Sequence, residues 1–524
     1  MGNSKNTRFN VISGYLERFI KSKMPKVAYF SSEFSVDVCD KHSMNEKYEL
    51  AGDIMSVANE FSLPIVGIGL IGNNKSKGSL VDTGIEVSVN ISRYQVYCKV
   101  WLLEGKNFNK IYLIDTELDK NPKEYRNINS SNKLYKDIAL GMLGMKLISE
   151  KVIDADIYHF NGEYALFSLI YMLQQSDKNN IEQNIVLEEI KKKCVLTIHN
   201  SIDNMPIYSL NLIKEILGEN IVKYFEKNIN KVEIYKILND KFKVTNGTSI
   251  MHSRYLCKKL KTDKKNSISY VTNGIHIPTW IDEPIIKILK ESDKFLSERR
   301  KLKISFIEYV EEKTGKKLDP DKLLIGFCGI SKEFKRNDLI LRKKEVIEGL
   351  LADDKLQLVF SLSEEKNANV SSALRNLKEL SEKYQDKVIN LGIYNRENEK
   401  ELVKGVDLWI NSSRKPSDPC DMIAIKAAMN GVLNLSTMSG CWPEVCVEGI
   451  NGWQIGSGTV VEKKNEQDDH DVSSLYDVLT TKIVPTYYEN SEKWNDMILQ
   501  SIKSTIEYFD IERMIIEYYD KLYK

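Results

Sequence analysis

The segment VDLWINSSRKPSDPCDMIAIKAAMNGVLNLS, residues 406–436, contains the pattern from which we infer the fold. Its two short apolar runs, at 406–412 and 432–436, are typical of buried β-strands. Between them, residues 419–430 form an apolar run with helical spacing. A strand, a helix and a second strand in this order are typical of a parallel sheet whose faces are covered by helices.

The same alternation continues in both directions from this segment. A first block has expected strands at 26–32, 64–69, 110–116, 156–161, 194–200 and 268–276, expected helices at 50–61 and 133–150, and a half-exposed hairpin at 84–103. A polar helical stretch at 283–318 separates it from a second block with expected strands at 323–329, 356–362, 387–392, 406–412 and 432–436. We therefore expect an α/β protein with two doubly wound domains. Ligands of such sheets bind outside the carboxyl ends of the strands, which we expect to face a cleft.

Composition limits the classes of function. A chain of 524 residues is too long for a single core, and its 75 basic and 74 acidic residues give a formal net charge of +1. That balance provides no long-range attraction to nucleic acid or to anionic lipid. No stretch approaches the roughly 18 apolar residues of a membrane span. The start MGNSKNTRFNV lacks the apolar core of a signal peptide, and the eight cysteines contain no CxxC motif. We expect a cytoplasmic protein with reduced thiols, and an exposed loop at 461–471.

Lys426 stands on the apolar face of the expected helix 419–430. Met422, Ile425 and Met429 are three or four residues apart, and Lys426 falls on the same face. The side chain either extends along the apolar surface to reach water, or its amine is buried and kept for chemistry. A buried amine is expected to have a lowered pKa and to be nucleophilic.

Several strand-end segments resemble the glucan phosphorylases, especially the short bacterial maltodextrin-phosphorylase form. They are VAYFSSEF, DIYHFNGEYALF, TIHNS, YVTNGIHIPTW, GVDLWINSSRKP and KAAMNGVLNLSTMSGCWPE, in the family's order and at family-like spacing across residues 26–523. The resemblance implies the two-domain GT-B fold, with two Rossmann-like domains. The N-terminal domain, 1–282, would be the acceptor side, completed by a C-terminal helix at 505–524. The C-terminal domain, 283–504, would be the donor and cofactor side.

The resemblance also implies a chemistry and a set of site residues. The family carries out phosphorolysis of an α-1,4-glucan with pyridoxal phosphate held by a lysine, and its members are often homodimers. Carried over position by position, the catalytic residues are His199 and Lys335, the substrate-binding residues are Asn161, Asn273 and Asp418, the cofactor lysine is Lys426, and no metal is expected. Tyr164 stands where the family has another histidine, and His159 matches a family position for which we expect packing alone. By themselves, Asn273–Gly274 is also a turn signal and Asp418 is also a helix cap.

The positions that hold phosphate in the family are changed here. Residues 45–48, Asn-Glu-Lys-Tyr, replace a glycine-rich turn, and Ile330 replaces an arginine. At the start of helix 419–430, the sequence Ser-Asp-Pro-Cys-Asp replaces a Ser-Gly-Thr run with open N–H groups. The carboxylates there satisfy the helix end that an anion would otherwise occupy. We therefore expect ordinary phosphorolysis to be disfavoured.

Three functions remain open. The first, which we favour, is a phosphorylase-like glycosyltransferase that moves glucosyl units to or from an α-1,4-glucan. The second is a catalytically silent homologue that binds a sugar or a protein partner. The third is a retaining glycosyltransferase that uses a sugar nucleotide, whose diphosphate Lys335 and Arg336 would hold.

Overall fold

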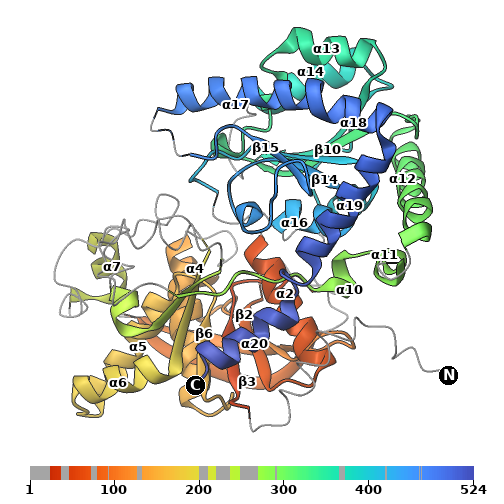
Figure 1. Cartoon of the computed structure of the whole chain (residues 1–524). Coiled ribbons are helices and arrows are strands. Elements are labelled where there is room, and N and C mark those ends of the chain that lie inside the picture. Colours follow the sequence, from red (N-terminus) through yellow and green to blue (C-terminus); the bar gives the residue numbers. More distant parts are fainter. Residues whose placement is uncertain are drawn as a thin grey trace. The chain divides into compact units, whose positions relative to one another are not determined.

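A computed structural model of the chain describes residues 24–36, 46–71, 80–91, 94–126, 133–199, 210–219, 237–247, 269–288, 292–364, 372–418, 422–459, 461 and 463–524. The described residues form two compact units (Figure 1). Of the described residues, the N-terminal unit contains those from Met24 to His276 together with Ile511–Lys524, and the C-terminal unit contains those from Ile277 to Asp510. The boundaries implied by the family resemblance, at 282 and 505, lie close to these.

The N-terminal unit is built on a nine-stranded sheet in the order β3-β4-β5-β2-β1-β6-β7-β8-β9. Its strands are β1 Val27–Phe30, β2 Ile65–Leu70, β3 Leu80–Ile91, β4 Tyr94–Leu103, β5 Ile111–Asp115, β6 Ile157–Phe160, β7 Cys194–Ile198, β8 Lys243–Asn246 and β9 Ser269–Tyr270. In this sheet order, the strands β5, β2, β1, β6, β7, β8 and β9 are parallel to their neighbours. Strands β3 and β4 form the expected antiparallel hairpin at one edge, and β4 pairs antiparallel with β5. The order of the parallel strands reverses between β1 and β6, which makes this the switch point of the sheet.

Helices cover both faces of this sheet, each over its own hydrophobic core. One face carries α4 Lys133–Ser149, α5 Ala165–Lys178, α6 Gln183–Lys193 and α7 Leu210–Leu217, and the short α3 Lys123–Arg126 precedes α4. The other face carries α2 Glu46–Glu60 and the C-terminal helix α20 Ile511–Lys521, which pack together (Figure 1). The C-terminal helix therefore completes the hydrophobic core of the N-terminal unit.

The C-terminal unit contains a six-stranded, wholly parallel sheet in the order β12-β11-β10-β13-β14-β15. Its strands are β10 Leu323–Ser331, β11 Leu356–Glu364, β12 Val388–Asn390, β13 Leu408–Asn411, β14 Leu433–Thr437 and β15 Gly452–Ile455. Numbered within the unit, this is the order 3-2-1-4-5-6 of the classic dinucleotide-binding fold. The switch point lies between β10 and β13, so loops that follow these two strands are the natural position for a ligand.

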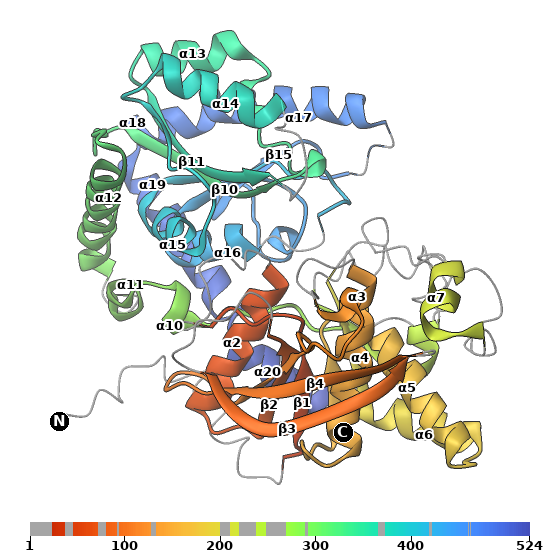
Figure 2. The same cartoon turned by 180° about the vertical axis from the view of Figure 1, so that it is seen from behind.

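The helices of the C-terminal unit also lie on both sides of its sheet. They are α10 Ile277–Trp280, α11 Glu283–Ile288, α12 Ser292–Thr314, α13 Lys344–Ala352, α14 Ser372–Lys383, α15 Arg396–Gly405, α16 Met422–Met429, α17 Lys464–Val478, α18 Val484–Glu489 and α19 Ser491–Ile506. Figure 2 shows α13, α14 and α17 on one side of the sheet, and α15, α16 and α19 on the other. The expected α/β class, with two doubly wound sheets, is confirmed. Trp409, Trp442 and Trp453 are buried in the core.

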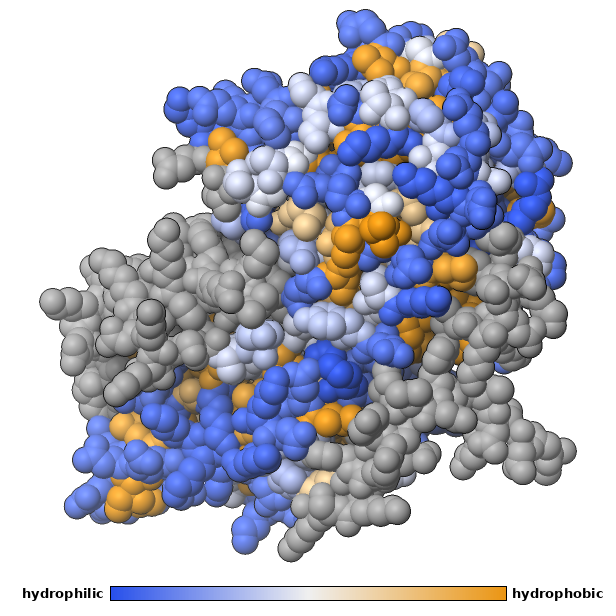
Figure 3. Space-filling view, in the orientation of Figure 1, coloured by the Kyte–Doolittle hydropathy of each residue, from blue (hydrophilic) through white to orange (hydrophobic). Residues whose placement is uncertain are grey.

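One expected loop is a helix. Residues 464–471 belong to α17, although their sequence is almost entirely polar. Asp468 and Asp471 are nevertheless buried, because arginines from other elements pair with them. The outward surfaces of α12 and α17 are mainly hydrophilic (Figure 3), in keeping with the balanced charge of the chain. Within the described residues, none of the helices has both the length and the apolar content needed to cross a bilayer.

Candidate functional sites at the strand ends

Three neighbouring strands of the N-terminal unit bring His199 and Asn273 together. His199 follows β7, Gly247 follows β8, and Asn273 lies just beyond β9. The Asn273 side-chain amide lies 3.3 Å from His199 Nδ1, and the Asn273 backbone N–H donates to the Gly247 carbonyl at 2.9 Å. We call His199 and Asn273 the strand-end pair. It unites two side chains that are 74 positions apart in the sequence.

Gly247 allows the strand-end pair to form. A Cβ atom at this position would lie 2.4 Å from Asn273 Oδ1 and 2.8 Å from His199 Cε1, closer than side chains can approach. The glycine is therefore required by the close approach of two side chains rather than by a turn. Nothing in the local sequence pattern around Gly247 predicted this contact.

Asn161 lies at the switch point, directly after β6. Its backbone N–H donates to the Phe30 carbonyl at 3.0 Å and to the Tyr164 hydroxyl at 3.1 Å. Tyr164 in turn donates to the Phe30 carbonyl at 2.6 Å and is buried. The tyrosine that replaces a family histidine is thus an anchor between the ends of β1 and β6, and burial raises its pKa well above the ordinary value.

His159, in β6, is fully buried and packs as expected. Its Nδ1 lies 2.6 Å from the Tyr523 hydroxyl, and its Nε2 lies 2.6 Å from Thr197 Oγ1. Burial, with a smaller repulsion from His199, lowers the pKa of His159 to about 3. This neutral imidazole therefore ties the C-terminal segment to the middle of the sheet.

In the C-terminal unit, Lys335 and Asp418 meet at the switch point. Lys335 follows β10, and its Nζ donates to Asp418 Oδ2 at 2.6 Å. Ser413, just after β13, donates to the same oxygen at 2.7 Å. The Asp418 side chain is 4% exposed and that of Lys335 is 21% exposed. The structure therefore brings together two of the predicted residues, but as an ion pair.

Arg336, beside Lys335, forms buried ion pairs with two aspartates of α17. Its guanidinium donates to Asp468 at 2.8 Å, to Asp471 at 2.7 Å and to the Ser412 carbonyl at 2.8 Å, and its side chain is 1% exposed. Burial opposes ionisation of Asp468, but hydrogen bonds from arginines outweigh burial and hold the pKa of its carboxyl below the ordinary value. Arg336 therefore points into the protein, where it joins the strand ends to α17.

Lys426 is buried and paired. All eight residues of α16 are buried, and Lys426 Nζ donates to Glu399 Oε1, on α15, at 2.7 Å. The Tyr394 hydroxyl donates to the other oxygen of Glu399. The ammonium also lies 3.3 Å from the centroid of the Trp280 ring. The interpretation in which the Lys426 side chain reaches water is therefore wrong. The amine is buried, and it has an acidic partner, Glu399, that the local sequence did not predict.

These contacts bear on whether pyridoxal phosphate fits at Lys426. A lysine that carries the cofactor needs open space beside its nitrogen for a substituted pyridine ring. Here that nitrogen has a carboxylate on one side and an indole ring at van der Waals distance on another. The arrangement described therefore does not fit the group. No cluster of acidic, histidine or cysteine side chains suited to a metal ion occurs in the part of the chain that the structure describes.

The altered phosphate positions are only partly visible. Asn45 and residues 419–421 lie outside the described residues, as do the side chains of Glu46 and Lys47. Tyr48 is described, and its hydroxyl accepts a hydrogen bond from Ser32 at 2.9 Å. Ile330 lies inside β10, opposite Ser363 of β11, so it offers an apolar group where the family has an arginine.

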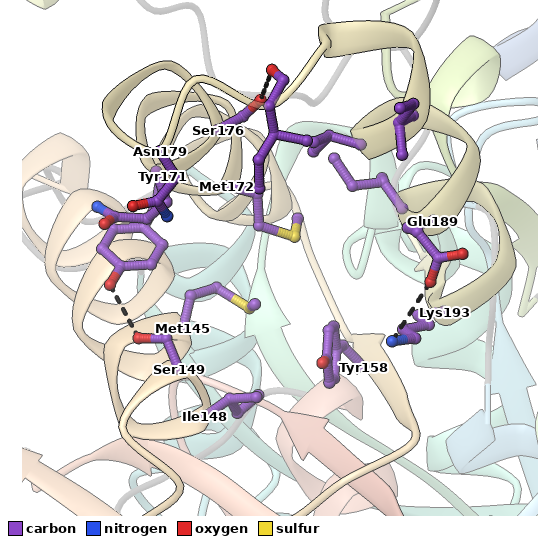
Figure 4. Close-up of a pocket in the computed structure, with 15 residues that line it drawn as sticks. Met145, Ile148, Ser149, Tyr158, Tyr171, Met172, Ser176, Asn179, Glu189 and Lys193 are labelled. Carbon is purple, nitrogen blue, oxygen red and sulfur yellow. Dashed lines mark hydrogen bonds and ion pairs between the residues drawn. The ribbon is translucent and has the colours of Figure 1, made fainter.

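A cavity of about 400 Å³ lies among α4, α5 and α6 in the N-terminal unit. Figure 4 shows Met145, Met172 and Tyr158 around the space, with the Glu189–Lys193 ion pair at one side. The lining is mostly apolar and includes none of the predicted site residues. Sugars are bound through hydroxyl groups, so this cavity lacks the polar lining that a glucan needs.

Comparison with known proteins identifies relatives over nearly the whole chain. The chain is 25% identical to a glycogen phosphorylase of Aquifex aeolicus, over 90% of this chain and 82% of that protein. It is 24% identical to a maltodextrin phosphorylase of Thermococcus litoralis, over 90% of this chain and 67% of the relative.

Over nearly its whole length, the chain is therefore similar to glycogen and maltodextrin phosphorylases. The chain is also 24% identical to an uncharacterized protein of Methanocaldococcus jannaschii, over 96% of this chain and the whole of that protein. No family model matches. Two doubly wound sheets agree with the GT-B fold of the phosphorylases, and the resemblance seen in the sequence is confirmed.

Proposed function

We propose that this chain is a phosphorylase-like glycosyltransferase whose N-terminal unit binds an α-1,4-glucan. The strand-end pair is the observation that carries the proposal. His199 and Asn273 come from distant segments, both match sugar-contacting positions of the family, and they lie 3.3 Å apart at the carboxyl end of a parallel sheet. An imidazole and a carboxamide provide both donors and acceptors, which suits the hydroxyl groups of a neutral sugar.

The other predicted residues have parts in the same proposal. Asn161, at the end of the strand beside β7, is a further sugar contact. Asp418 is a proposed sugar contact because it matches a sugar-contacting position of the family and carboxylate oxygens accept hydrogen bonds from hydroxyl groups. Lys335 is the proposed catalytic residue of the C-terminal unit. Each role is a proposal that rests on the position of the residue at a strand end.

Calorimetric titration with maltooligosaccharides tests the proposal. We expect binding heat with the unsubstituted chain and its loss in Asn273→Ala, because the amide that contacts the sugar is removed. Asn59→Ala is the matched control, since Asn59 lies on α2 and donates only to the Lys106 carbonyl among the contacts described. The proposal would be contradicted if the unsubstituted chain gave no binding heat with any of the maltooligosaccharides tested, or if Asn273→Ala and Asn59→Ala gave equal heat.

A silent sugar-binding homologue is the second candidate. It is favoured by one observation: Lys335 and Lys426, the two lysines carried over from the family, are both in ion pairs with carboxylates of the same unit. Release of glucose 1-phosphate from maltodextrin and inorganic phosphate separates the two candidates. Release supports the enzyme, whereas binding of maltooligosaccharide without release supports the silent homologue.

The remaining expectations are proposals with their own tests. Pyridoxal phosphate is the cofactor that family membership implies, and the absorbance of purified protein after addition of the cofactor tests for it. No step is assigned to it, because the contacts of Lys426 do not fit the group. A sugar nucleotide would find Arg336 already held by two aspartates, and calorimetry with nucleotide sugars tests that alternative. Size-exclusion chromatography with light scattering tests the homodimer, and cell fractionation tests the cytoplasmic location.

A further inference from the structure

The ion pair between Lys426 and Glu399 is deeply buried. The two side chains are 3% and 0% exposed, and Lys426 Nζ lies 2.7 Å from Glu399 Oε1. Tyr394 donates to the second carboxylate oxygen, so both oxygens of Glu399 have donors from their own unit. A carboxylate at this depth is costly to keep ionised without a cation beside it. Glu399 therefore needs the ammonium of Lys426.

The Trp280 ring lies against the same ammonium. Its ring is fully buried, with the Lys426 ammonium 3.3 Å and the Arg396 guanidinium carbon 5.3 Å from its centroid. Contacts of this kind are attractive because the face of an indole is electron-rich. The Trp280 carbonyl also accepts a hydrogen bond from Asn430, one turn after Lys426, at 2.9 Å. Helix α10, in which Trp280 lies, is thus fastened to α16 by a side chain and by its backbone.

We propose that Lys426 is a structural cation that holds α10, α15 and α16 together, and that this chain attaches no pyridoxal phosphate to it. The family's cofactor lysine has in this way become the centre of a salt-bridge cluster. Covalent attachment would require a ring beside a nitrogen that Glu399 and Trp280 already enclose. The proposal does not depend on the sugar-binding function, which maltooligosaccharide titration tests separately.

Reductive trapping tests the proposal on the unsubstituted chain. The purified full-length protein is incubated with pyridoxal phosphate, reduced with borohydride, digested and analysed by peptide mass spectrometry. We expect modification of exposed lysines such as Lys301, whose side chain is 67% exposed, and no modification of Lys426. A pyridoxyl group recovered on Lys426, or cofactor bound there in the protein as purified, would overturn the proposal.

A stability cycle tests the structural role by a second readout. We expect Lys426→Met and Glu399→Gln each to lower the folding equilibrium constant by two to four orders of magnitude, roughly 3–5 kcal/mol, because each strands a buried charge. The double variant is expected to lose less than the sum of the two, since it strands none. Lys303→Met is the matched control, because Lys303 forms a buried ion pair with Asp407 at 2.6 Å elsewhere in the unit and should lose comparable stability.

The stability of Lys426→Met can also contradict the proposal. An amine kept for covalent chemistry is a burden on stability, so Lys426→Met would then leave the folding equilibrium unchanged or raise it. That outcome would overturn the structural role. If a variant does not fold, the trapping experiment still decides, because it uses the unsubstituted protein.

Discussion

The buried imidazole of His159 makes the N-terminal unit sensitive to acid. Its pKa is about 3 in the folded chain, compared with an ordinary value of 6.5. In the acid range between these values the unfolded chain binds a proton that the folded chain does not, so stability falls as pH falls through the ordinary value. At about pH 5 the loss from this one group is roughly 2 kcal/mol relative to neutral pH.

Replacement of His159 by Gln removes the titrating group but keeps a donor and an acceptor for Thr197 and Tyr523. We expect the variant to be less stable than the unsubstituted chain at about pH 7.5, and the difference to shrink by roughly 2 kcal/mol at about pH 5. Hydrogen exchange of peptides from β6 and α20, corrected for the intrinsic pH dependence of exchange, measures the stability of this unit alone.

Tyr523→Phe provides the control for this comparison. It removes the hydroxyl that lies 2.6 Å from His159 Nδ1 but leaves the buried imidazole in place. Its loss of stability is expected to be nearly the same at both pH values. If His159→Gln gave an equally constant difference, the imidazole would not be the acid-sensitive group, and the reasoning from its burial would be refuted.

Three further variants test the strand ends. Arg336→Ala removes the arginine that pairs with buried Asp471, while Asp468 keeps Arg342 and Arg414, and it should cost roughly 3–5 kcal/mol in urea unfolding. Lys482→Ala, which breaks an exposed pair, should cost under about 1 kcal/mol. Gly247→Ala forces the strand-end pair apart, so maltooligosaccharide affinity in calorimetry should fall at least about tenfold, since misplaced polar groups lose binding energy. Asp418→Asn removes the acidic partner of Lys335, and phosphate affinity by calorimetry should rise; an unchanged value would mean that Lys335 does not bind anions.

The sequence predicted most of the framework because strands and helices follow local periodicity. The apolar runs around residues 323–329, 356–362 and 432–436 all form strands of the expected sheet. His199, which the family resemblance gave as a site residue, lies just after β7, where side chains that follow buried parallel strands gather at one edge. The place of Lys426 among Met422, Ile425 and Met429 allowed burial but left open a side chain that reaches water, and the structure shows burial.

The parts that were not predicted depend on pairs of charges that are distant in the sequence. Glu399 lies in RENEKELVKG, which is polar enough to suggest an exposed helix, yet its side chain is fully buried because Lys426, 27 positions away, neutralises it. A weak signal was present, since Glu399 shares a helical face with Leu402 and Val403, both buried. The helix α17 was missed for the same reason: its buried aspartates are neutralised by arginines from other elements.

These ion pairs determine which ligand the C-terminal unit accepts most readily. Lys335, Lys426 and Arg336 each have a carboxylate partner within 2.8 Å, so a phosphate dianion that approached them would have to displace a carboxylate already in place. Lys415 differs, because its Nζ donates to the Gly458 carbonyl at 2.6 Å and burial lowers its pKa. A neutral hexose needs no displaced charge, since hydroxyl groups hydrogen-bond to carboxylates as readily as to ammonium groups. The strand ends of this unit are therefore better suited to a sugar than to inorganic phosphate. We accordingly expect the chain to bind a sugar even if it does not catalyse phosphorolysis.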